Sequence, residues 1–225
     1  MIVSAMQPYY FPSIHYYQLI FSSDIFVILD NVNFINRGFI HKNYFIDRAT
    51  KEKKIFNLII EKKSQNKLIK DLKLIDYKKS FENLKKNYEK NKNFKDVYEK
   101  VFIKKIFKKE YNSVIDLLVI SIKEICNLLG INTKIILSSS LKQNKFTAQK
   151  RILDYVKQLN GKQYINFIGG SHLYDKKLFE ENSIKLKFLK NNLHKHSKIS
   201  ILHTLAKYGL KETKNNFIKN YELVE

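Results

Sequence analysis

Residues 1–30 read MIVSAMQPYYFPSIHYYQLIFSSDIFVILD, and this stretch decides the fold class. The apolar run from Met1 to Met6 predicts a strand, and the two prolines that follow predict a turn. The tyrosine-rich stretch after them predicts a short helix, and the β-rich run that ends at Asp30 predicts a second strand. This order predicts a βαβ unit, in which polar groups at the carboxyl ends of neighbouring strands meet at one crevice.

The remainder of the chain alternates between strand and helix patterns. The expected strands are 55–60, 68–75, 133–137, 163–168 and, last, 184–189, and the expected helices after residue 130 are 147–159 and 174–182. From about residue 80 to residue 130, apolar residues recur at helical spacing in three segments, of which 113–129 is the strongest. We therefore predict an α/β fold over residues 1–225 in a single domain, with a largely parallel sheet, helices on its faces and a helical insertion at about 80–130.

Charge is the most conspicuous feature of the composition, with 42 basic residues and a formal net charge of +21 in 225 residues. Only Arg37, Arg48 and Arg151 are arginine, whereas proteins that read DNA sequence rely on arginine for bidentate guanine contacts. We therefore predict no nucleic-acid partner. We interpret most lysines as solvent-exposed surface residues, whose abundance follows from the codon usage of an AT-rich genome. The alternative is an anionic partner, such as a sugar nucleotide, an acyl-carrier protein or a phosphate-bearing membrane surface.

Cysteine and histidine usage argues against a disulfide or a metal centre. The single cysteine, Cys126, lies at helical spacing among apolar residues and is expected to be buried core. His194 and His196 lack a nearby carboxylate or cysteine, so no metal site is predicted, and the sequence does not identify a cofactor. The chain shows neither an export signal nor an apolar run long enough to span a membrane, and we expect a cytoplasmic protein.

A first group of candidate substrate-binding residues belongs to the βαβ unit: Gln7, Tyr10, His15 and Gln18. Gln7 follows the first strand and His15 begins the predicted helix, so both are placed near the strand ends. A histidine at a helix start weakly resembles HIGH-type nucleotidyltransferases, although the second histidine and the glycine of that motif are missing. The structural alternative is that the aromatic residues of this loop are simply core.

A second group follows the second strand: Asp30, Asn33, Arg37, His41 and Asn43. An aspartate at the end of a buried strand suits a general base or a hydroxyl acceptor. Arg37 suits a bidentate contact with phosphate or carboxylate, and His41 can exchange a proton near neutral pH. The structural alternative is an Asp–Arg pair with surface asparagines.

A third group follows the strand 163–168: Gly169, Gly170, Ser171 and His172. Paired glycines there allow backbone amides to approach an anion, and the N-terminus of a following helix adds partial positive charge. The alternative is a tight turn without a ligand. Ser139 ends a neighbouring strand in the same way and is expected to line the same crevice.

Several segments also resemble, in the same order, the WbqC-like protein family. They are MQPYYFPSIHYYQLI (6–20), SDIFVILDNVNF (23–34), NRGFIHKN (36–43), SSSL (138–141), YINFIGGSHLY (164–174) and SIL (200–202) near Tyr208 and Gly209. The N-terminal block is the most specific part of the resemblance. The chain departs from the family pattern at His15, Phe39, Lys42 and His203, where glycine, tryptophan, arginine and aspartate are expected.

Members of that family are bacterial and often accompany genes for O-antigen or other surface-polysaccharide synthesis. The resemblance implies an acyl- or aminoacyl-type transferase that acts on a nucleotide-linked amino sugar, with an acyl donor or an acyl-carrier protein as partner. In that mechanism Asp30 or His41 deprotonates the attacking amine, with His15 as a third catalytic candidate, and Arg37 with the turn at 169–171 holds phosphates. A nucleotidyltransferase-like or adenylate-forming enzyme and a non-catalytic binding protein stay open as alternatives.

Overall fold

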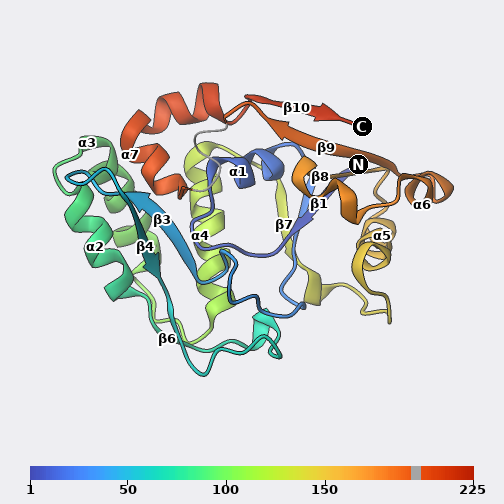
Figure 1. The fold of residues 1–225 in the computed structure, drawn as a ribbon, viewed down its shortest axis with the longest axis horizontal. Helices are drawn as coiled ribbons and strands as arrows, with labels where there is room; N and C mark the ends of the chain where they lie inside the picture. The colour runs from blue at the N-terminus through green and yellow to red at the C-terminus, as the bar shows by residue number, and fades with distance from the viewer. Residues whose placement is uncertain (194–198) are drawn as a thin grey trace.

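The computed structural model describes residues 1–193 and 199–225, and its centre is a six-stranded sheet in the order β10-β9-β8-β1-β2-β7 (Figure 1). Its strands are β1 (Ile2–Met6), β2 (Ile25–Ile28), β7 (Lys134–Leu137), β8 (Gln163–Phe167), β9 (Lys185–Asn191) and β10 (Tyr221–Val224). Neighbouring strands pair in parallel, except that β10 pairs antiparallel with β9. The predicted α/β fold with a largely parallel sheet is confirmed.

The N-terminal stretch forms the predicted βαβ unit, in which α1 (Ile14–Phe21) connects β1 to β2. Residues 14–20 are all buried, because α1 lies between the sheet and a further layer of helices. β1 stands in the middle of the sheet, with β2 on one side and β8 on the other. The chain leaves β1 toward one face of the sheet and leaves β8 toward the other, so their carboxyl ends form a topological switch point.

The two faces of the sheet are buried in two separate apolar clusters. α1 and α4 (Val114–Leu129) belong to the first cluster, to which β2 contributes Phe26 and Ile28. α5 (Ala148–Gln158) and α6 (Lys176–Glu181) belong to the second, to which the sheet contributes Val27. Alternate residues of β2 therefore face opposite layers, as expected for a parallel strand that is covered on both sides.

A helical layer occupies the middle of the chain, as predicted. It consists of α2 (Lys78–Tyr88), α3 (Lys92–Val97), a π-helical segment (Tyr98–Ile106) that continues α3, and α4. Phe81 of α2 joins this layer to the loop after β1, since its ring lies 5.5 Å from that of Phe11 and 4.6 Å from that of Phe102. In the described part of the chain, no helix combines the length and apolarity needed to cross a membrane.

Two small antiparallel sheets lie beside this layer, and they correct the prediction of one strand over residues 55–60. β3 (Lys42–Ile46) pairs with β4 (Lys53–Asn57), and β5 (Ile59–Ile60) pairs with β6 (Leu74–Asp76). Leu58 separates β4 from β5, because its amide donates to the carbonyl oxygen of His41 at 2.8 Å. The strand predicted at 68–75 is instead a 3-10 turn (Ile69–Asp71) followed by β6.

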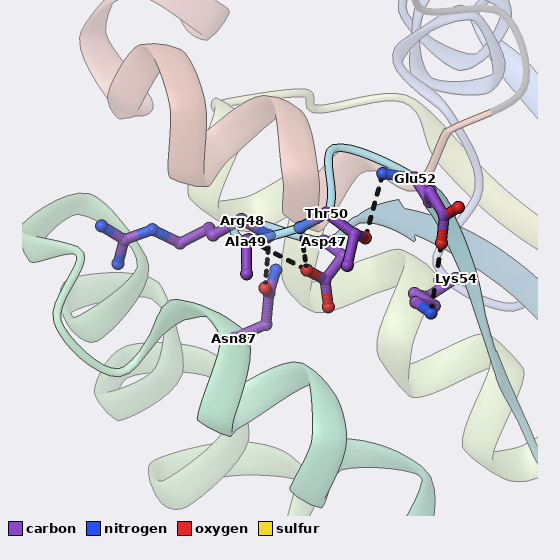
Figure 2. Close-up of polar contacts among 7 residues, drawn as sticks. All are labelled: Asp47, Arg48, Ala49, Thr50, Glu52, Lys54 and Asn87. Atoms are coloured by element: carbon purple, nitrogen blue, oxygen red, sulfur yellow. Dashed lines mark hydrogen bonds and ion pairs between the residues drawn. The ribbon is translucent and has the colours of Figure 1, made fainter.

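The turn between β3 and β4 is fixed by polar contacts to its own backbone and to α2 (Figure 2). Asp47 accepts hydrogen bonds from the amides of Ala49 and Thr50, each at 2.9 Å. Asn87 of α2 accepts from the Arg48 amide at 2.9 Å and donates to the carbonyl oxygen of Ile46 at 3.0 Å. The hairpin is thereby held on the helical layer, and β3 carries residues of the candidate site.

The C-terminal region was not predicted as regular structure, and β9 is not the last strand. After β9 come α7 (Ile201–Glu212), a π-helical segment (Thr213–Phe217) and β10. The buried side chain of Gln18 holds this region, since its Nε2 donates to the carbonyl oxygens of Phe217 at 2.8 Å and Asn220 at 3.0 Å. Gln18, predicted to bind substrate, therefore makes structural hydrogen bonds that close the fold.

Candidate functional site

A pocket of about 260 Å³ opens at the topological switch point between β1 and β8. The loop after β1, the start of α1, the turn after β8, the end of β9 and the segment around β3 all contribute to it. Its lining residues are Tyr9, Pro12, Ser13, His15, Tyr16, Phe39, Asn43, Phe167, Ile168, Gly169, Leu189 and Asn191. This is the position at which open α/β sheets bind ligands. Of the residues predicted for the crevice, His15, Asn43 and Gly169 line this pocket.

Aromatic rings form much of the wall of this pocket. The ring of Tyr9 lies 5.6 Å from that of Tyr16 and 5.7 Å from that of Phe39. Burial raises the pKa of both tyrosines, so their phenol groups are neutral at physiological pH. Among the residues that the structure describes, the lining contains no aspartate, glutamate, lysine or arginine. The pocket therefore suits an uncharged, ring-shaped group, because aromatic faces pack well on such groups and an unpaired charge there is costly.

Asn43 fixes the backbone of the loop after β1, which lines the pocket. Its Nδ2 donates to the carbonyl oxygens of Tyr10 at 2.9 Å and Phe11 at 2.8 Å, and its Oδ1 accepts from the amide of Tyr44 at 2.8 Å. Phe11 has a positive φ of 41°, a conformation that is uncommon for a non-glycine residue. Asn43 thus stabilises the unusual backbone of the loop after β1, and Tyr10, whose ring is fully buried, belongs to the same support.

His15 is the one basic side chain among the described residues that line the pocket. It lies in the first turn of α1 and is 5% exposed, and its Nε2 is 3.2 Å from the carbonyl oxygen of Leu193. A carbonyl oxygen only accepts hydrogen bonds, so Nε2 donates this one, and in a neutral imidazole of that tautomer Nδ1 is the acceptor atom. Ser13 precedes this turn as the N-cap, and its hydroxyl makes no capping hydrogen bond.

Neither steric crowding nor a positive φ requires a glycine at position 169. A Cβ built there meets no atom within 4 Å, and its φ is not positive, in contrast to Gly130 and Gly209. Its neighbour Gly170 resembles it, since a Cβ there meets only Leu173 at 3.9 Å. Gly169 lines the pocket, whereas Gly170 does not. Gly169 is exposed at the pocket, so a ligand there can approach its backbone without meeting a side chain.

The turn that contains these glycines is a 3-10 helix (Ile168–Leu173) and is not followed directly by the N-terminus of a helix, since α6 begins at Lys176. A helix follows the turn as predicted, but it begins at Lys176 instead of Tyr174, and the role of the turn as an anion cradle stays a prediction. Ser171 and His172 belong to this turn but do not line the pocket, and His172 is exposed.

Asp30 lies elsewhere, at the ends of β2 and β7. Its Oδ1 accepts from the Ser138 hydroxyl at 2.8 Å and from the Ser139 amide at 2.9 Å, and the residue is 1% exposed. Gln143 closes this end of the sheet, because its Oε1 accepts from Asn31 at 2.7 Å and from Tyr155 at 3.0 Å. Ser139, predicted to line the same crevice as the glycine turn, instead donates its amide hydrogen to Asp30 and does not line the pocket.

His41 is buried against Phe34, with the two rings 5.2 Å apart, and does not line the pocket. Burial lowers the pKa of His41 to about 4, with Lys63 and Lys42 adding to the effect, so its imidazole is neutral at physiological pH. Its Nδ1 is buried and has no hydrogen-bond partner among the described residues. The expected proton exchange near neutral pH does not fit a pKa this low.

The remaining predicted residues are spread around the switch point. Gln7 is half-buried, and its carbonyl oxygen accepts from the Tyr16 hydroxyl at 3.0 Å. Asn33 and Arg37 are exposed on the loop that precedes β3, and neither lines the pocket. The structure therefore brings His15, Asn43 and Gly169 together and places Asp30, His41 and Arg37 outside that group.

Comparison with known proteins assigns the family. The model of the WbqC-like protein family matches residues 7–211. This chain belongs to the WbqC-like protein family. No curated protein and no solved structure matches the chain. All pocket-lining residues of this WbqC-like protein fall within the matched range, as does the Asp30 network.

Part of the pocket of this WbqC-like protein was not predicted from the sequence. Ser13, Phe39, Phe167 and Asn191 line it but were not proposed. Asn191 is the most informative of them, because its Oδ1 is buried without a hydrogen-bond partner among the described residues. A polar residue two positions beyond the buried Leu189 was the available signal, but the strand was expected to end at Leu189.

Two further predictions concern reactive side chains. Cys126 is buried in α4, and burial raises its pKa to about 12, as suits a core residue. No group of three or more potential metal ligands occurs among the described residues. His194 and His196 lie outside those residues.

Asp30→Ala is expected to lower the free energy of unfolding by about 1–3 kcal/mol, because the buried Ser138 hydroxyl and the Ser139 amide lose their acceptor. Asp30→Asn keeps an oxygen at the same place and is expected to cost less. Urea denaturation of both variants measures the difference. An Asp30→Asn variant of normal stability that has lost turnover would instead assign Asp30 to proton transfer.

Proposed function

We propose that this WbqC-like protein is a cytoplasmic enzyme of bacterial surface-polysaccharide biosynthesis that transfers an acyl or aminoacyl group to the amine of a nucleotide-linked amino sugar. The pathway rests on the family, and the substrate class rests on the pocket at the switch point. The observation that carries the proposal is the combination of an uncharged aromatic wall with the vacant side-chain position at Gly169. These features suit a sugar ring that approaches the backbone closely.

A volume of about 260 Å³ lies just below the range of pockets that enclose a whole small-molecule ligand. The pocket therefore holds the sugar, and the nucleotide extends from its mouth. The N-terminal turn of α1 borders the pocket through Ser13 and His15 and offers partial positive charge to the diphosphate. In this arrangement the phosphates need no cationic side chain inside the pocket.

The uncharged lining also favours the reactive form of the substrate. An ammonium group without a carboxylate partner is costly to bury, so the pocket lowers the pKa of the sugar amine and binds it as the free base. The amine nitrogen attacks the carbonyl carbon of an acyl thioester, the carbon–sulfur bond breaks, and the thiolate leaves. Nδ1 of His15 takes the proton from the nitrogen and returns it to the thiolate. Orientation of the two substrates provides most of the remaining acceleration.

A ligand screen tests the substrate class directly. The protein is heated with UDP-, GDP-, TDP- and CMP-linked amino sugars, with the same sugars without a nucleotide, with ATP and with coenzyme A. We expect one nucleotide-linked amino sugar to raise the melting temperature in a concentration-dependent way, because a ligand that binds only the folded state stabilises it by mass action. Stabilisation by ATP alone would favour a nucleotidyl-transferring enzyme and contradict the proposal.

A further inference from the structure

A second concave surface lies between the end of the π-helical segment and α4. It shares no lining residue with the switch-point pocket. It is a groove of about 570 Å³ that we call the lysine groove. Its rim carries Lys104, Lys105, Lys108, Lys109 and Lys123. Its floor is apolar and consists of Tyr111, Val119, Ile120 and Leu137. The lysine groove thus combines clustered positive charge with a surface on which apolar side chains can pack.

The five ammonium groups of the lysine groove make no ion pair with any residue between 1 and 193 or between 199 and 225. Two carboxylates, Asp116 and Glu124, lie in the same groove but do not pair with them. Elsewhere exposed lysines do form such pairs, as Lys78 does with Glu110. Unpaired like charges around one groove repel each other, and an anionic partner relieves that repulsion.

We propose that the lysine groove docks an acidic helix of the carrier protein that delivers the acyl thioester. An acidic amphipathic helix matches both parts of the groove, since its charged side meets the lysines and its apolar side meets the floor. This inference rests on the proposed acyl transfer, which needs a donor that the switch-point pocket does not hold. A second copy of this chain is a poor occupant, because its own lysine groove carries the same charge.

The place of the groove in the fold suits delivery to the pocket. Leu137 ends β7, and β7, β2 and β1 are parallel neighbours in the sheet. The carboxyl ends of these strands lie along one edge, so the end of β7 is about 10 Å from the end of β1 at two strand spacings. A thioester on the flexible arm of a docked carrier therefore needs to reach along one edge of the sheet.

The test compares two charge-matched triple variants of the full chain. One replaces lysines of the groove, as Lys104→Glu, Lys105→Glu and Lys108→Glu. The control replaces exposed lysines near α5, as Lys150→Glu, Lys157→Glu and Lys162→Glu, which change the net charge by the same amount. The probe is acetyl-loaded acyl-carrier protein, and calorimetry measures its dissociation constant at low and at moderate salt.

We expect the wild type to bind the carrier, with affinity that falls as salt is added. The groove variant is expected to bind at least about tenfold more weakly, which corresponds to about 1.4 kcal/mol, while the control variant stays within about twofold. Absence of binding by the wild type, or equal losses in both variants, would overturn the proposal. So would a groove variant that binds the carrier normally but loses binding to phosphatidylglycerol vesicles.

Binding of the nucleotide-linked amino sugar, measured on the same samples, separates this inference from the proposed function. The groove variant is expected to retain that affinity, because the lysine groove and the pocket share no lining residue. If the sugar binds and the carrier does not, only the docking site is wrong. If no nucleotide-linked sugar binds, the proposed function is wrong as well.

Discussion

His15→Gln is expected to lower turnover by about 10²–10⁴-fold, the usual cost of removing a general base, while affinity for the nucleotide-linked sugar changes by less than about tenfold. His15 is the general base proposed above; it lines the pocket, and the carbonyl oxygen of Leu193 lies 3.2 Å from its Nε2. Glutamine offers an amide nitrogen in the place of Nε2, so the contact with Leu193 is retained. Its side chain cannot accept a proton at neutral pH.

Single-turnover rates across pH 5–9 measure this effect. The rate of the wild type is expected to depend on pH through its general base, whereas the residual rate of His15→Gln lacks that dependence. His15→Ala serves as the second variant, since it also removes the contact with Leu193. If Gln restores the activity that Ala loses, His15 is a positioning residue and the general base lies elsewhere.

The fold was predictable wherever the chain uses local patterns. The strand, loop, helix and strand of residues 1–30 follow from apolar runs and two prolines, and α4 follows from helical spacing and a glycine end. α7 was missed although Ser200 caps it and Leu202 and Ala206 follow at helical spacing. A sharp change of backbone direction at Gly209, with φ of 79°, lies within it and obscures the pattern.

The candidate site was predictable only in part. Residues that follow neighbouring parallel strands lie along the same edge of the sheet, but they need not line the same pocket. Asp30 and His15 follow neighbouring strands, yet Asp30 accepts hydrogen bonds from Ser138 and Ser139 and His15 faces the pocket. The direction in which each loop leaves the sheet decides between these outcomes, and it depends on strand order. The sequence indicates every strand of the central sheet except β10, but not that β8 lies next to β1.

Gly169→Ala is expected to weaken binding of the nucleotide-linked sugar by about 10–200-fold, the effect of one misplaced methyl group in a fitted pocket. The same substitution leaves the protein intact, because the new Cβ meets no atom within 4 Å and the backbone φ is permitted. A slightly higher melting temperature is expected, since alanine restricts the unfolded chain more than glycine does.

Gly170→Ala is the matched control, because it adds the same methyl group one residue away, outside the pocket lining and in ordinary contact with Leu173. Calorimetric titration of both variants with the sugar nucleotide found in the screen tests most directly whether the switch-point pocket is the substrate site. We expect Gly169→Ala to lose affinity and Gly170→Ala to stay within about twofold of the wild type. Wild-type affinity in a folded Gly169→Ala protein would contradict it.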